Sequence, residues 1–166
     1  LKDLLASGDG IGCHTFDHLA PGDLSTLGYH DSIERNLSAL QAQLPSAKPL
    51  SFAYPFGRAN LRTKADCSKR FTSCRSTLPG INRGIVDLNL LRACRLYSGT
   101  MPLNTIEHLL AETIRLGGWL IFYTHDVSPR PSKYGCTPEY FERVVELSAA
   151  SGAMIRPVAE MIECLV

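Results

Sequence analysis

Short apolar segments alternate with longer segments of helical periodicity along most of the chain. The sequence predicts strands at residues 11–14, 50–54, 72–75, 91–97, 119–124 and 153–157. Helices are predicted between and after them, at residues 31–44, 61–71, 104–116, 137–150 and 158–165. Strands that alternate with helices in this way form parallel βαβ units. We therefore predict an α/β fold, with functional side chains collected at the carboxyl ends of its strands.

Local signals support three of the helices. Thr137 is a good N-cap and is followed by Pro138, a residue favoured at the first helical position. Asp31 or Ser32 is expected to cap the helix of residues 31–44. Gly117 ends the helix of residues 104–116.

Length and composition describe an ordinary globular domain. The chain has 166 residues, 45% hydrophobic and 20% charged, so one domain over residues 1–166 is expected. The net charge of +1 and the absence of a basic cluster argue against binding nucleic acid or an anionic membrane. The longest apolar run, residues 119–123, is too short to span a bilayer.

The cysteines show no metal-binding spacing. None forms a C-x-x-C pair, and scattered cysteines in a chain of this length are typical of buried free thiols. We expect all of them to be reduced, which slightly favours a cytoplasmic location: Cys13, Cys67, Cys74, Cys94, Cys136 and Cys164.

The first segment with chemical potential is residues 14–18, His-Thr-Phe-Asp-His. If the segment turns helically, His14 and His18 lie on one face and reach a single metal ion. Thr15 and Asp17 are candidates for hydrogen bonds that orient the rings. The alternative is that the histidines are merely polar residues at a strand-to-helix turn.

Two more segments end apolar runs. Residues 52–57 run into Pro55 and Gly57, a turn that can aim a backbone N–H at an oxyanion or serve only for packing. Residues 119–124 are expected to form a strand buried on both faces, followed by His125, a side chain suited to proton transfer at neutral pH. Asp126 is expected to orient the following loop rather than the ring, because neighbours on a strand point opposite ways. His30 and His108 are expected at the surface.

In this order, the three segments resemble the polysaccharide deacetylase family, carbohydrate esterase family four. Residues 11–19 match its motif H-[ST]-x-x-H, residues 52–57 resemble its third motif, and residues 119–126 resemble its fifth. The resemblance implies a distorted (β/α)7 barrel and a hydrolase that removes acetyl groups from an N- or O-acetylated glycan. It also implies a divalent metal, Zn²⁺ in first place, bound by His14 and His18.

Further roles come from the same resemblance. His125 matches the general acid that protonates the leaving group, and the backbone N–H of Phe56 matches a donor to the oxyanion. Tyr123 matches the apolar lining of the acetyl pocket. Tyr54, Pro55 and Trp119 are further candidates for substrate contact.

The chain also departs from the family pattern. The opening motif, a strand ending in two aspartates that supply the catalytic base and the third metal ligand, is absent. Because residue 1 is Leu, we expect the motif upstream of it and a barrel that is incomplete at the N-terminus. An incomplete barrel leaves strand edges open, so we expect that the chain pairs with another copy, swaps an element or belongs to a longer polypeptide. Ala53 stands where the family often has Arg, and Arg75 and Asp87 occupy the region of the fourth motif without an assignable role. With two of three ligands, the chain by itself is expected to bind metal weakly and to be inactive.

Two other functions fit the sequence. The missing aspartates and Ala53 favour a non-catalytic carbohydrate-binding relative. A metal-independent relative that hydrolyses C–N bonds of small cyclic amides is opposed by the complete histidine pair.

Overall fold

The computed structural model describes residues 2–164 and divides them into two compact units. The first unit comprises residues up to Ser76, Asp87–Leu91 and the segment from Arg156 onward. The second comprises Thr77–Val86 and Arg92–Ile155. The prediction of a single domain stays a prediction.

The first unit is built on parallel strand pairing. Strand β1 (Ser51–Ala53) pairs in parallel with β2 (Ser73–Arg75), with Phe52 opposite Cys74. Single parallel bridges extend the pairing on both sides, from Cys13 to Phe52 and from Arg75 to Leu91. The result is a narrow parallel sheet with its carboxyl ends at residues 14, 54 and 76.

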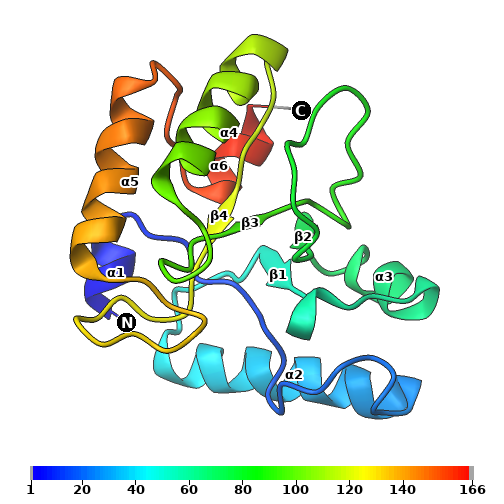
Figure 1. Cartoon of the computed structure of the whole chain (residues 1–166). Coiled ribbons are helices and arrows are strands. Elements are labelled where there is room, and N and C mark those ends of the chain that lie inside the picture. The colour runs from blue at the N-terminus through cyan, green and yellow to red at the C-terminus, as the bar shows by residue number, and fades with distance from the viewer. Residues whose placement is uncertain (1, 165–166) are drawn as a thin grey trace. The chain divides into compact units, whose positions relative to one another are not determined.

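Helices pack beside this sheet, as Figure 1 shows for α2 (Thr26–Gln43) and α3 (Leu61–Cys67). Ser25 caps α2 by accepting a hydrogen bond from the Gly28 N–H, and Asn60 forms a reciprocal capping box with Thr63. Two shorter helices, α1 (Lys2–Ala6) and α6 (Val158–Glu163), lie near the chain ends. The core consists of Cys13, Tyr29, Ile33, Phe52, Tyr54, Cys67, Phe71 and Cys74.

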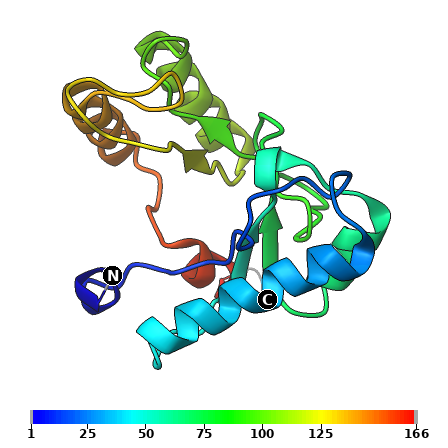
Figure 2. The same ribbon diagram turned by 90° about the horizontal axis from the view of Figure 1, so that it is seen from below.

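The second unit pairs β3 (Cys94–Arg95) with β4 (Phe122–Tyr123), again in parallel. Helices α4 (Leu103–Leu116) and α5 (Pro138–Ala150) lie side by side in both views (Figures 1 and 2). Their apolar faces enclose a core that includes Leu96, Ile106, Leu110 and Val144. Gly117 ends α4 in the left-handed conformation and Thr137 caps α5, as predicted.

The observed elements correct several predicted boundaries. Helix α2 begins at Thr26, so neither Asp31 nor Ser32 is its cap, and Ser32 is instead fully buried. Residues 11–14 form only a bridge, and residues 153–157 form no strand. The strand expected at 119–124 shrinks to Phe122–Tyr123, which are half-buried rather than enclosed on both faces.

The prediction of an α/β class with parallel strands is confirmed, while residues 2–164 form no closed barrel. The cysteines are free thiols, as predicted, and all are buried except Cys164. Within the described residues, no helix has the length and apolar character needed to cross a membrane. His30, expected at the surface, is half-buried in α2 against Arg70, whereas His108 is exposed as predicted.

Candidate functional site

The segment of residues 14–18 is a strained turn rather than a helix. Thr15 and His18 have φ angles of 62° and 53°, a left-handed conformation that is costly for residues with a side chain and most of all for a β-branched one. Thr15 is buried, and its hydroxyl oxygen accepts a hydrogen bond from the His18 N–H at 3.1 Å. The condition of a helical turn is therefore not met, yet the turn still brings the two histidine rings together.

The ring of His14 is fixed by the neighbouring strand. Its Nδ1 lies 2.6 Å from the backbone carbonyl oxygen of Ala53, the last residue of β1. Because a carbonyl only accepts, Nδ1 carries the proton and Nε2 carries the lone pair that a metal ligand requires. A backbone carbonyl bound to the second ring nitrogen is the arrangement that orients most metal-binding histidines. The sequence predicted Thr15 and Asp17 for this role, and the carbonyl of Ala53 holds it.

His18 completes the pair. Its ring centroid lies 4.8 Å from that of His14 in an edge-to-face arrangement, and its side chain is exposed. The ring of Phe56, which belongs to the segment of residues 52–57, packs against His18 with the two ring centroids 4.7 Å apart. The Phe56 residue is 58% exposed. Residues predicted from separate motifs, His14, His18 and Phe56, thus form one cluster.

Phe56 shares the backbone strain of this cluster. It lies in the short helix η1 (Pro55–Gly57) with a φ of 55°, and Gly57 follows with a φ of 68°. In the described part of the chain, Thr15, His18 and Phe56 are all of the non-glycine residues with positive φ. Such strain collects at functional sites, where the surrounding structure enforces it. For this turn, the sequence allowed a close approach or a positive φ at Gly57 and gave no signal for Phe56.

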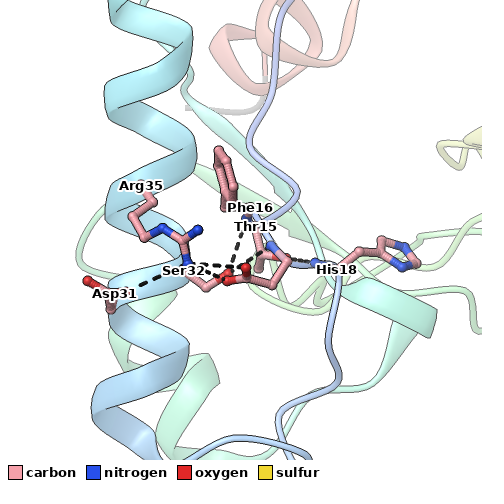
Figure 3. Close-up of polar contacts among 7 residues, drawn as sticks. Thr15, Phe16, His18, Asp31, Ser32 and Arg35 are labelled. Carbon is pink, nitrogen blue, oxygen red and sulfur yellow. Dashed lines mark hydrogen bonds and ion pairs between the residues drawn. The ribbon is translucent and has the colours of Figure 1, made fainter.

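Helix α2 lies beside the turn and binds it through Ser32 and Arg35 (Figure 3). The Ser32 hydroxyl oxygen accepts hydrogen bonds from the N–H groups of Phe16 and Asp17, both at 3.1 Å. Arg35 donates to both carboxylate oxygens of Asp17 at 3.0 and 3.1 Å, and its guanidinium lies 4.3 Å from the Phe16 ring centroid. In Figure 3 the His18 ring points away from this helix.

Tyr54 and Pro55 lie inside the first unit. Tyr54 is 1% exposed, and its hydroxyl donates to the backbone carbonyl of Asn89 at 3.1 Å. Phe52 packs edge-to-face on Tyr54. Burial raises the pKa of the Tyr54 phenol above its ordinary value. Their positions give Tyr54 and Pro55 a role in packing beneath the turn, with no exposed surface for the substrate contact predicted for them.

His125 lies in the second unit among aromatic side chains. Its ring centroid is 5.6 Å from that of Tyr134, 5.9 Å from Tyr97 and 6.3 Å from Tyr123. Its Nδ1 is 3.3 Å from the Tyr134 carbonyl oxygen, and the Tyr97 hydroxyl lies 3.5 Å from the same nitrogen. His125 is exposed, so this ring is oriented at Nδ1 and accessible to solvent. Tyr97 and Tyr134 were not predicted as part of this cluster.

Asp126 shapes the loop that follows, as predicted. Its carboxylate accepts hydrogen bonds from the hydroxyl and the N–H of Ser132, at 2.6 and 2.8 Å. These bonds hold the pKa of the Asp126 carboxyl below its ordinary value. Gly135 packs so closely on Asp126 that a Cβ there would lie 2.3 Å from its Oδ1. The loop returns to bring the Tyr134 carbonyl onto His125.

The remaining candidates lie elsewhere. Trp119 forms an antiparallel bridge with Asn82 at the start of its segment, on the order of 20 Å from His125 at the rise of an extended chain. Asp87 forms an ion pair with Lys64 of α3, which gives it a structural partner. Arg75 ends β2. The structure therefore groups Tyr123 with His125 and leaves Trp119 apart.

The histidine pair fits a divalent metal in donor type. Two imidazoles suit Zn²⁺ and related ions, and His14 has the required tautomer. Over residues 2–164, no three His, Cys, Asp or Glu side chains gather into a complete metal site. The first unit thus offers two protein ligands, fewer than the three usual for catalytic zinc.

Comparison with known sequences agrees with the predicted resemblance over the first part of the chain. Residues 1–70 match the family described as Polysaccharide deacetylase, and this range contains His14, His18 and Phe56. No curated protein and no solved structure matched in the same comparisons. Residues 1–70 are thus similar to part of a polysaccharide deacetylase domain.

Proposed function

We propose that this chain carries the metal-binding pair and the general acid of a deacetylase that removes acetyl groups from an N- or O-acetylated polysaccharide. The observation that carries the proposal is the strained turn at His14 and His18. Non-glycine backbone strain, an oriented imidazole and an exposed partner ring coincide within the segment that matches the family. A packing turn has no need of these three properties together.

His14 and His18 would hold the metal, with Zn²⁺ as the first candidate. When bound, such an ion polarises the acetyl carbonyl and lowers the pKa of water. The Ala53 carbonyl keeps the proton of His14 on Nδ1, so Nε2 would be the neutral donor that holds the ion. Phe56 packs on one side of His18 and limits the directions that this ring can take.

Phe56 has a second proposed role through its backbone. In the left-handed conformation at φ 55°, the N–H of Phe56 points in a direction that an ordinary extended residue would not give it. We assign this N–H to the developing oxyanion, as the family resemblance implies. A donor fixed by the backbone needs no reorganisation during the reaction.

His125 is the proposed general acid. The Tyr134 carbonyl accepts from Nδ1, which leaves Nε2 as the atom that delivers a proton to the leaving amine or alcohol. Tyr123 stands two residues earlier and contacts the His125 ring edge-to-face, so it is the proposed lining for the acetyl methyl group. The aromatic side chains around His125 restrict the directions that its ring can take.

Acetate release from acetylated oligosaccharides tests the proposal, measured with the complete gene product that contains these residues. His125→Gln is expected to lower the rate about 10²- to 10⁴-fold, the usual contribution of a general acid. His108→Gln, an exposed histidine of α4, is the matched control and is expected to leave the rate unchanged. An unchanged rate in His125→Gln would refute its role. Oligosaccharide binding without any acetate release would favour the carbohydrate-binding alternative.

A further inference from the structure

We propose that Ser32 and Arg35 of α2 are positioning residues that set the direction of the His18 ring. The expected effect on metal binding rests on the proposed function. The positioning of His18 itself rests only on the contacts between α2 and the turn. Neither residue takes part in the sequence motif, and neither touches a histidine ring in the contacts described above.

The residues of α2 that contact the turn lie on one face of the helix. Ser32, Arg35 and Asn36 stand at helical spacings of three and four, so they share one face of α2. Asn36 accepts a hydrogen bond from the His14 N–H at 3.3 Å, and the Ser32 hydroxyl oxygen accepts from the N–H groups of Phe16 and Asp17. The Ser32 carbonyl oxygen also accepts from the Phe16 N–H at 3.0 Å. One helix face therefore binds the backbone between the two histidines.

These contacts stabilise a strained backbone conformation in the turn. Thr15 and His18 both occupy the left-handed region, which is unfavourable for either residue in isolation. Such a conformation persists only where neighbouring contacts over-determine it. Ser32 is completely buried, so its hydrogen bonds are made away from competing water.

Arg35 makes two different contacts with the turn. Its guanidinium binds both oxygens of Asp17, the residue directly before His18, and stacks on Phe16. A planar guanidinium combines these two contacts, whereas a lysine ammonium has no planar face to stack. Arg35 and Asp17 together fix the peptide that leads into His18, so rotation of that peptide would turn the ring away from His14.

The surroundings of Arg35 provide a control. Asp31 lies 4.0 Å from the same guanidinium, one helical turn earlier, and among the described residues it forms no hydrogen bond with residues 14–18. Removing Asp31 changes the charge beside Arg35 as much as removing Asp17 does, but it leaves the turn's hydrogen bonds in place. Asp31→Ala and Asp17→Ala are therefore a matched pair that separates charge from positioning.

The experiment combines NMR of His18 with Co²⁺ titration of the same chain. Arg35→Ala, a substitution of a side chain that is 47% exposed, is expected to shift the backbone and ring signals of His18 without changing the urea midpoint appreciably. Co²⁺ affinity is expected to fall about 10- to 100-fold, the usual effect of losing a group that orients a metal ligand. Arg35→Lys should recover part of this loss.

A double-mutant cycle tests the route of the effect. If Arg35 acts through Asp17, the double variant Asp17→Ala/Arg35→Ala loses no more affinity than either single variant, and Asp31→Ala loses none. Unchanged His18 signals in Arg35→Ala would overturn the inference, whatever the metal does. Absence of Co²⁺ binding in the unmodified chain would instead overturn the proposed function, and the His18 signals would still decide the positioning role.

Discussion

Replacing Gly12 by Ala is predicted to destabilise the first unit and to disturb the histidine turn that starts two residues later. A Cβ at Gly12 would lie 2.7 Å from the Ser51 hydroxyl oxygen and 3.0 Å from the Ser51 carbonyl oxygen. The hydroxyl can rotate away, but the carbonyl belongs to β1 and already accepts a hydrogen bond from the Cys13 N–H at 2.9 Å. The clash is therefore relieved only by shifting the backbone pairing.

The magnitude follows from three contributions. Overpacking a tight contact costs about 1–3 kcal/mol. Weakening the Cys13–Ser51 hydrogen bond costs up to about 1 kcal/mol. The lower entropy of the unfolded chain with Ala offsets roughly 0.4–1 kcal/mol. The sum of these contributions runs from about 0 to 3.6 kcal/mol, so we expect Gly12→Ala to lower the free energy of unfolding by about 2 kcal/mol.

Urea denaturation measures this change, with Gly10→Ala as the control. A Cβ at Gly10 has no atom within 4 Å, so that variant is expected to be neutral or slightly stabilised. Adding Ser51→Ala removes the hydroxyl contact but not the carbonyl contact, so it should restore only part of the loss. If Gly12→Ala is as stable as Gly10→Ala, the close approach described here does not constrain the turn.

Three further predictions concern other parts of the chain. Thr137→Ala removes the side-chain cap of α5 and should lower the free energy of unfolding by about 1 kcal/mol, measured by urea denaturation. Burial raises the pKa of the Cys13 thiol from 9.0 to about 11, so the unfolded chain ionises first and stability should fall as pH rises through this range. This difference in pKa corresponds to about 2–3 kcal/mol of unfolding free energy. Between pH 8 and 11, the free energy of unfolding of Cys13→Ala should therefore fall less steeply than that of the unmodified chain. An equally steep fall in both proteins would contradict the assignment. Gly135→Ala would place a Cβ 2.5 Å from the Asp126 carbonyl oxygen and should expose the loop amides to hydrogen exchange, whereas Gly99→Ala, with open space around it, should not.

The sequence was sufficient for the features that depend on local signals. The caps at Thr137 and Gly117, the parallel class and the position of Asp126 on its own loop all follow from residues close together in the chain. It was not sufficient for boundaries set by packing. Helix α2 begins at Thr26 because Ser25 caps it, and Ser32, one of the two predicted caps, is buried and binds the turn.

In the candidate site, too, some features follow from the local sequence and others arise only in the folded structure. The sequence predicted that His14 and His18 lie together, on the condition that the segment turns helically, because residues at i and i+4 share one face of a helix. The left-handed residues Thr15 and His18 gave no sequence signal, since neither is a glycine. Likewise, the Ala53 carbonyl and Tyr134 reach the histidines only through the folded backbone, and such contacts have no signature in residue type.

Zinc titration of this chain tests the central claim most directly. The account predicts one Zn²⁺ per chain by calorimetry, with affinity reduced at least about 10-fold in His14→Ala and in His18→Ala and unchanged in the control His108→Ala. Equal affinity in all four proteins, or no binding by the unmodified chain, would contradict the assignment of His14 and His18 as a metal-binding pair.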